Sequence, residues 1–269
     1  MTASLADIQV PEGSDGNPSD DIIRVQDLTV GFDGVPLLEH LSFGVRRGEV
    51  FVILGGSGSG KSTLLKHMIG LYEPMSGRII IDGQDMAAAH GEVRMALLRK
   101  IGVAYQSGAL FGSMSLLENI CLPLEAHTRL DHDARELVAR MKLRLVGLSG
   151  FENHLPSELS GGMQKRAAIA RAMALDPMVL FLDEPSAGLD PVTSADLDQL
   201  ILRLSSTLGM TFVVVSHEMA SVHIIADRVI MLDPESRGII AEGEPGWLRE
   251  HARHPRVRRF FNRQASEAA

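Results

Sequence analysis

The sequence predicts an α/β fold in which strands alternate with helices around a mainly parallel sheet. Continuous apolar runs of strand length occur at Val50–Leu54 and Val179–Leu182, as expected for buried strands. Segments with helical character follow at Ser62–Gly70 and Pro191–Leu208. A hydrophobic content of 45% with only 4% aromatic residues also fits an α/β protein rich in aliphatic side chains.

The first third of the chain is expected to begin with a disordered acidic leader. Residues 1–21 contain five acidic residues and no lysine or arginine, and they have little apolar periodicity. The segments that follow predict strands at Ile22–Val30, Leu41–Val45, Val50–Leu54, Arg78–Ile81 and Ile101–Tyr105, with helices at Ser62–Gly70 and Glu92–Arg99.

Residues 107–165 differ in character from the segments on either side. They contain helical stretches at Ser115–Ile120 and His132–Val146 and the start of a helix at Gly162, with no strong strand signal. We therefore expect a helical subdomain inserted into the core. The core resumes with a strand at Met178–Leu182, a helix at Pro191–Leu208, and strands at Thr211–Val215 and near Val229–Leu232. One domain is expected over residues 22–246.

The last segment, residues 247–269, is expected to be a basic C-terminal tail. The chain has a formal net charge of −8, yet Trp247–Arg263 holds six arginines against one glutamate. The acidic balance argues against a general nucleic-acid binder. The tail is interpreted either as a contact surface for an acidic partner or anionic lipid head groups, or as a solvated helix end.

Composition excludes several other classes. No run approaches about 18 consecutive apolar residues, so the chain is not predicted to span a membrane. No basic start followed by an apolar stretch indicates a secretory signal. Cys121 is the only cysteine, which excludes an internal disulfide and a cysteine metal cluster. These features fit a cytosolic location.

A glycine-rich loop between the strand Val50–Leu54 and the following helix predicts a phosphate-binding site. Its residues match the pattern G-x-x-x-x-G-K-[ST]: Gly55, Gly56, Ser57, Gly58, Ser59, Gly60, Lys61 and Ser62. Backbone N–H groups of such a loop and the helix N-terminus attract phosphate oxygens. Lys61 is expected to neutralise the β- and γ-phosphates, Ser62 to supply an oxygen to Mg²⁺, and Thr63 to reinforce contacts near the α-phosphate.

Two carboxylates follow the apolar strand Val179–Leu182. Strand ends are where open parallel sheets place ligands, so Asp183 is expected to orient Mg²⁺ and Glu184 to polarise the attacking water. His217, after the strand Thr211–Ser216, is expected to hydrogen-bond the γ-phosphate. Gln106, after the strand Ile101–Tyr105, is positioned to reach Mg²⁺ and the water from the same sheet edge.

A second glycine-rich turn, Leu159–Met163, opens another helix and offers a second set of phosphate-seeking amides. One phosphate-binding pocket needs only one such set of amides. The turn therefore suggests a site that is closed by another copy of the protein, so that nucleotide binding would lead to dimerisation.

With these motifs in order, the chain resembles the nucleotide-binding subunit of ABC transporters over roughly residues 22–245. The resemblance implies a P-loop NTPase (RecA-like) core with a mainly parallel sheet, a small antiparallel β subdomain and an inserted helical subdomain. It implies ATP and Mg²⁺ as ligands and a peripheral location on the cytoplasmic face of the inner (plasma) membrane. By the same resemblance, Phe32 stacks on adenine, and Gln106 is the loop glutamine that senses the membrane partner.

The resemblance also implies roles for three further segments. Ser160, Gly161 and Gly162 look like the signature that binds the γ-phosphate in the opposing subunit, Ser186–Asp190 like the loop through which the subunits communicate, and His217 like the switch histidine. Gly56 is a departure, because many relatives carry proline there; it loosens the loop but removes no phosphate donor.

A narrower resemblance concerns the segments Gln106–Phe111, Ser115–Ile120 and His254–Phe261, which are similar to the ATPase of Mla-type and Mce-associated phospholipid transporters. It implies permease subunits, an Mce-domain protein and, in some members, a STAS-domain protein as partners. The alternatives are an importer for polar amino acids or another small solute, and a soluble ABC-type ATPase acting on ribosomes or DNA. Ala109, Leu110 and Phe111 are interpreted either as a permease docking surface or as subdomain core.

Overall fold

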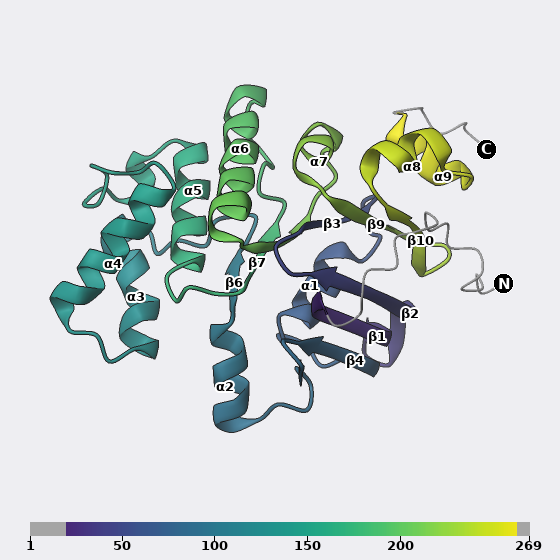
Figure 1. Ribbon diagram of the computed structural model, residues 1–269, viewed down its shortest axis with the longest axis horizontal. Coiled ribbons are helices and arrows are strands. Elements are labelled where there is room, and N and C mark those ends of the chain that lie inside the picture. The colour runs from purple at the N-terminus through teal and green to yellow at the C-terminus, as the bar shows by residue number, and fades with distance from the viewer. Residues whose placement is uncertain (1–19, 263–269) are drawn as a thin grey trace.

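The computed structural model describes residues 20–262, so the expected leader up to residue 19 and tail residues 263–269 lie outside the described part. Its centre is a six-stranded sheet in the order β10-β9-β3-β8-β7-β6 (Figure 1). The strands are β3 (Val50–Gly55), β6 (Ile101–Ala104), β7 (Val179–Asp183), β8 (Thr211–Val215), β9 (Arg228–Asp233) and β10 (Gly238–Gly243). All neighbouring pairs are parallel except β9 and β10.

A second, antiparallel sheet packs beside the first in the order β2-β1-β4-β5. Its strands are β1 (Asp21–Phe32), β2 (Val35–Arg46), β4 (Ser76–Ile81) and β5 (Gln84–Asp85). The hairpin β1–β2 is longer than the sequence predicted, because its turn is confined to Asp33 and Gly34 and its register is interrupted by bulges that break the simple alternation of apolar residues.

The helices surround the larger sheet and form a separate group at one end of the molecule (Figure 1). That group contains α3 (Leu116–His127), α4 (His132–Leu145) and α5 (Gly161–Ala172), and the short η3 (Pro156–Glu158) precedes α5. The others are α1 (Lys61–Met68), α2 (Gly91–Arg99), α6 (Pro191–Leu208), α7 (Met219–Ile225), α8 (Pro245–His251) and α9 (Pro255–Phe261). The fold class predicted from the sequence is thereby confirmed.

The central strands are buried on both faces, which explains their continuous apolar runs. In β3, Val50, Val52 and Leu54 join the core cluster shared with α3 to α9. Phe51 and Ile53 point the other way, into the core shared with the antiparallel sheet and α1. The larger sheet is therefore the layer that separates two hydrophobic cores.

Local sequence signals set several helix starts. Ser115 and Glu118 form a capping box at α3, and Asp131 caps α4. Asp190 accepts hydrogen bonds from the amides of Val192 and Thr193 at α6, whose first residue is a proline. The helix predicted at Ser115–Ile120 continues to His127, past Pro123, because Ile120 and Leu124 pack into the core.

The C-terminal segment differs from the tail that the sequence suggested. Residues 245–261 contain α8 and α9, and Leu248, Val257 and Phe261 are buried in the core shared with α7. Arg256 forms ion pairs with Asp233 and Glu235. At least this arginine of the basic segment therefore forms contacts within the chain itself.

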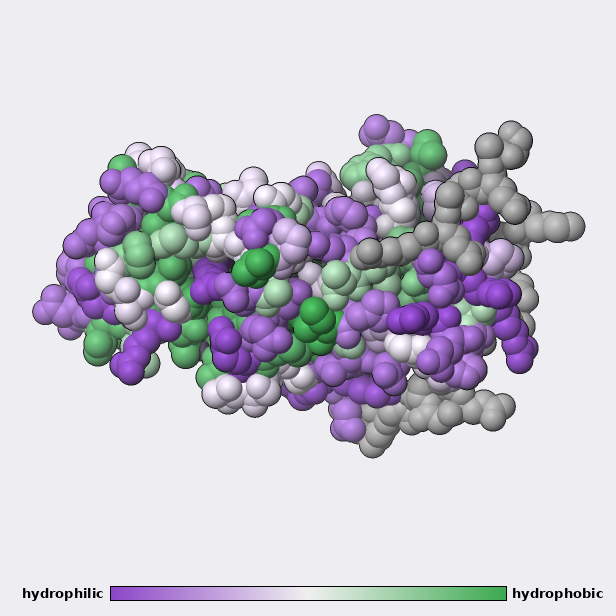
Figure 2. Space-filling model, turned by 90° about the horizontal axis from the view of Figure 1, so that it is seen from above, coloured by the Kyte–Doolittle hydropathy of each residue, from purple (hydrophilic) through white to green (hydrophobic). Residues whose placement is uncertain are grey.

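Apolar side chains also reach the surface in the half of the molecule that holds α3, α4 and α5. Figure 2 shows one face of the molecule, with hydrophobic surface over this half. Its large exposed apolar residues include Phe111, Leu137, Met141 and Leu145. Among the described residues, no helix combines the length and the hydropathy that crossing a bilayer requires.

Candidate active site

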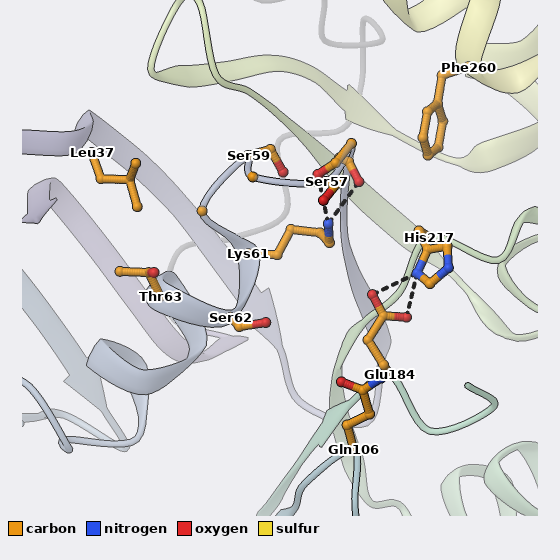
Figure 3. Close-up of a pocket in the computed structure, with 14 residues that line it drawn as sticks. Leu37, Ser57, Ser59, Lys61, Ser62, Thr63, Gln106, Glu184, His217 and Phe260 are labelled. Carbon is orange, nitrogen blue, oxygen red and sulfur yellow. Dashed lines mark hydrogen bonds and ion pairs between the residues drawn. The ribbon is translucent and has the colours of Figure 1, made fainter. Parts of the chain in front are cut away.

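A cavity of about 690 Å³ lies where the carboxyl ends of β3, β6, β7 and β8 meet (Figure 3). This is the edge at which open parallel sheets place ligands. The cavity is lined by Leu37, Gly55, Gly56, Ser57, Gly58, Ser59, Gly60, Lys61, Ser62, Thr63, Gln106, Glu184, His217 and Phe260. The structure thus brings the whole glycine-rich loop together with three polar residues from other strand ends.

The glycine-rich loop has a shape that requires glycine at its first position. Gly55 has a φ of 155°, and a Cβ there would lie 2.3 Å from Ser59 Oγ and 2.8 Å from the carbonyl oxygen of Leu232. The helix α1 begins directly after Gly60, and no side chain caps it. The first amides of α1 are therefore oriented to bind an anion at this end of the cavity.

Lys61 lies over the loop that precedes it. Its ammonium donates to the carbonyl oxygens of Gly55 at 2.9 Å and Gly56 at 3.0 Å. Burial lowers the pKa of Lys61, and the nearby carboxylates of Glu184 and Asp183 oppose this shift. The cavity thus contains a cation next to the phosphate-seeking amides.

Ser62 and Asp183 supply two neighbouring oxygens. Ser62 Oγ donates to Asp183 Oδ1 at 3.4 Å. Burial and the charge of Glu184 raise the pKa of Asp183, whereas Ser62 and two lysines oppose the shift. A hydroxyl and a carboxylate are the hard oxygen donors that Mg²⁺ takes when substrate phosphates complete its shell, so these residues fit that ion.

Glu184 and His217 are joined directly. His217 Nδ1 lies 2.8 Å from each carboxylate oxygen of Glu184 (Figure 3). Glu184 has a φ of 47° and its amide donates to the carbonyl oxygen of Val215 at 2.9 Å. A non-glycine residue in the left-handed region is uncommon and is held there by its surroundings. The pair presents one acidic and one basic group at the cavity wall.

The second glycine-rich turn is not among the residues that line this cavity. Ser160 caps α5, and its Oγ accepts from the amide of Met163 at 3.3 Å. A Cβ at Gly162 would lie 2.3 Å from Thr193 Cγ2, so glycine permits the close approach of α6. Gly161 lies against Leu189 of the segment Ser186–Asp190. The turn and this segment are therefore neighbours in one chain.

Phe32 also lies outside the set of lining residues. Its ring meets Tyr72 edge-on, with centroids 5.4 Å apart, and lies 6.4 Å from the ring of His67. Phe32 is 47% exposed, so one face of this aromatic cluster is open.

Leu37 and Phe260 line the cavity but were not singled out as site residues. Leu37 belongs to an irregular strand and carries no motif. Phe260 lies in α9 and points toward His217 in Figure 3. Its place depends on how α9 packs against the rest of the chain, and in the sequence it appeared only as part of the segment His254–Phe261.

The segment Ala109–Phe111 has features of both interpretations, the permease docking surface and the subdomain core. Leu110 packs partly against the core, whereas Phe111 is 50% exposed. The guanidinium carbon of Arg171 lies 5.9 Å from the centroid of the Phe111 ring.

The fold and the cavity together define an ATP-binding cassette: a phosphate loop, an acidic strand end and a separate signature turn on one α/β core. Residues 38–187 match the family model described as ABC transporter. The chain therefore belongs to the ABC transporter family, as the sequence predicted, and it is an ABC ATPase.

Individual relatives agree with this assignment. The chain is 38% identical over 241 residues to the intermembrane phospholipid transport system ATP-binding protein MlaF of Escherichia coli K12, covering 90% of this chain and 88% of MlaF. It is 41% identical over 221 residues to the probable ribonucleotide transport ATP-binding protein mkl of Mycobacterium leprae, covering 82% of this chain. It spans 64% of the length of mkl.

A solved structure is also similar. The dimeric structure of the ATP-binding cassette MJ0796 bound to ADP and Pi superposes with a TM-score of 0.74 and 31% identity, covering 82% of this chain and 98% of MJ0796. This likeness extends the family assignment to the three-dimensional fold.

Proposed function

We propose that the chain is the motor subunit of a membrane transporter, in which two identical copies bind and hydrolyse ATP beneath transmembrane permease subunits. It then lies on the cytoplasmic face of the inner membrane as a peripheral subunit. The observation that carries the proposal is the separation of the phosphate loop, which lines the cavity, from the signature turn, which does not. The similar cassette MJ0796 is dimeric, which supports a pair of copies.

The proposed binding of ATP follows from the cavity. The loop Gly55–Thr63 holds the phosphates, Lys61 neutralises them, and Phe32 stacks on the adenine. Ser62 and Asp183 are the residues that would hold Mg²⁺, and Gln106, two residues beyond β6, would approach it from the same edge of the sheet. When bound, Mg²⁺ supplies positive charge that offsets the charge of the phosphate oxygens.

In the proposed reaction, the carboxylate of Glu184 orients and polarises the water that attacks the γ-phosphate. His217, which contacts this carboxylate, turns to the γ-phosphate when ATP is present. Ser160, Gly161 and Gly162 of the second copy complete the phosphate shell from the opposite side. Hydrolysis and product release then separate the two copies.

Glu184→Gln tests the role of the carboxylate. An amide keeps the shape of the side chain but removes its charge, so we expect ATP turnover to fall by about a hundredfold or more while ATP binding persists. Turnover is measured as phosphate release and binding as retention of a fluorescent ATP analogue. Normal turnover in this variant would contradict the proposed reaction.

The proposed cargo is phospholipid or a related lipid. MlaF is named for phospholipid transport, and the match covers most of both chains. The segments Gln106–Phe111 and His254–Phe261 support the same group. A small solute is the second candidate, since mkl is named for ribonucleotide transport.

Purification of the intact complex distinguishes these cargoes. The tagged chain is extracted from membranes in detergent, and its partners and bound lipids are identified by mass spectrometry. Permease subunits, an Mce-domain protein and phospholipid are expected, with or without a STAS-domain protein. A periplasmic solute-binding protein in place of the Mce-domain protein would overturn the lipid cargo.

A further inference from the structure

One lysine of helix α5 contacts both of the loops that follow β6 and β7. Lys165 lies one turn beyond the signature turn that opens the helix. Its ammonium donates to the backbone carbonyl oxygen of Gln106 and lies 3.5 Å from that of Glu184. Gln106 lies two residues after β6 and Glu184 directly follows β7, so one side chain joins two loops of the cavity wall.

The surroundings of this ammonium make its contacts strong. Lys165 is half-buried, and burial lowers its pKa, while the carboxylates of Asp183 and Glu184 oppose this shift. A hydrogen bond from a charged donor is stronger than a neutral one, and more so away from bulk water. Fixing a long lysine side chain costs conformational entropy, which these contacts offset.

A second cation of α5 extends the same contact. Arg171 donates to the carbonyl oxygens of Gly108, at 3.2 Å, and Ala109, at 2.7 Å. Between the two cations, a Cβ built on Gly108 would lie 3.7 Å from the Cβ of Ala168. Lys165, Ala168 and Arg171 are spaced three residues apart and therefore lie on one face of α5. This face contacts the segment from Gln106 to Ala109.

We propose that Lys165 is a positioning residue that couples the signature turn of one copy to the catalytic glutamate of that same copy. This inference rests on the proposed function, in which Ser160–Gly162 contacts the nucleotide of the partner copy. When the turn binds that nucleotide, α5 shifts. The Lys165 ammonium transmits this shift to the backbones of Gln106 and Glu184. The nucleotide sites of the two copies are thereby linked through one rigid helix.

The test compares Lys165→Met, Lys165→Arg and Arg166→Met in the full-length chain. Methionine keeps the length of the side chain but removes the donor, whereas arginine keeps the charge. Arg166 is the matched control, because it is adjacent on α5 but is directed to Asp196 at 3.7 Å, away from both loops. Thermal melting of each variant establishes that it is folded.

Lys165→Met is expected to lower kcat for ATP about tenfold to a hundredfold, the loss that follows from removing a charged hydrogen bond that orients the reacting groups. Its KM for ATP should stay within about twofold, because the phosphate loop is intact. Lys165→Arg should recover most of kcat, and Arg166→Met should resemble the wild type.

Three results would overturn the inference: unchanged kcat in Lys165→Met, no recovery in Lys165→Arg, or an equal loss in Arg166→Met. Glu184→Gln, assayed in parallel, separates this failure from that of the proposed function. If Glu184→Gln hydrolyses ATP slowly and Lys165→Met hydrolyses it at the normal rate, only the role of Lys165 is contradicted. If the wild type hydrolyses no ATP, both fail.

Discussion

Replacing Asp198 by asparagine should stabilise the protein at neutral and alkaline pH. Asp198 of α6 is 3% exposed and lies beside two serines, Ser221 of α7 and Ser194 of its own helix, whose hydroxyl oxygens are 3.3 Å apart. Burial raises the pKa of Asp198 to about 6; the hydrogen bond with Ser221 opposes this shift and the charge of Glu218 adds to it.

The sign of the effect follows from this raised pKa. The folded protein holds the Asp198 proton more tightly than the unfolded chain, so the contribution to stability is fully present below the ordinary value of 3.8 and is lost as the pH rises through about 6. The shift corresponds to about 3 kcal/mol. A buried amide carries no charge but must still find partners for its N–H groups, so we expect asparagine to gain about 1–2 kcal/mol above this range, falling toward zero below it.

Urea denaturation measures this gain as a difference in the free energy of unfolding, at about pH 4.5 and about pH 8. Asp196→Asn is the matched control, because its side chain lies on the same helix and is 65% exposed. Asp198→Asn should gain more stability at the higher pH than at the lower, where most of the loss is not yet present, and the control should change little at either. An Asp198→Asn variant that is no more stable than the wild type at the higher pH would refute the reasoning.

Three further predictions concern other contacts. Arg228→Met should cost about 3–5 kcal/mol of unfolding free energy, because it leaves the carboxylates of Glu49 and Glu242 buried without their cation; a loss below 1 kcal/mol in urea denaturation, about the value of an exposed pair, would contradict this. Phe111→Asp should abolish co-purification with the permease and leave ATP binding intact, and unchanged co-purification would remove the docking role. Lys61→Ala should abolish ATP binding measured by a fluorescent analogue; full binding would contradict its place in the phosphate site.

Features encoded by local sequence could be predicted. The phosphate loop is a strand, a run of glycines and a helix in immediate succession, and Asp183 is the last residue of the buried strand β7. Asp190 and Pro191 mark the start of α6 by cap chemistry alone, and the observed bounds Pro191–Leu208 match the prediction. In each case the signal and the structure lie within a few residues of each other.

Features that depend on contacts between distant segments could not be predicted. Strand β10 and helices α7 to α9 are short, and the few apolar residues that they pack on the core follow no obvious period. Phe260 reaches the cavity only through the packing of α9. The contacts of Lys165 with Gln106 and Glu184 span 59 and 19 residues. No sequence pattern specifies such pairs.

The central claim is that ATP joins the phosphate loop of one copy to the signature turn of the other. Its most direct test is the mass in solution of Glu184→Gln, measured by light scattering with ATP and Mg²⁺. Ser160→Asp added to this variant keeps a helix cap but places a negative charge toward phosphate, and Ser160→Asn is its neutral control. We expect Glu184→Gln, alone or with Ser160→Asn, to have twice the chain mass of 29.2 kDa, and the aspartate variant to stay monomeric. A Glu184→Gln chain that binds ATP but stays at the single-chain mass would contradict the account.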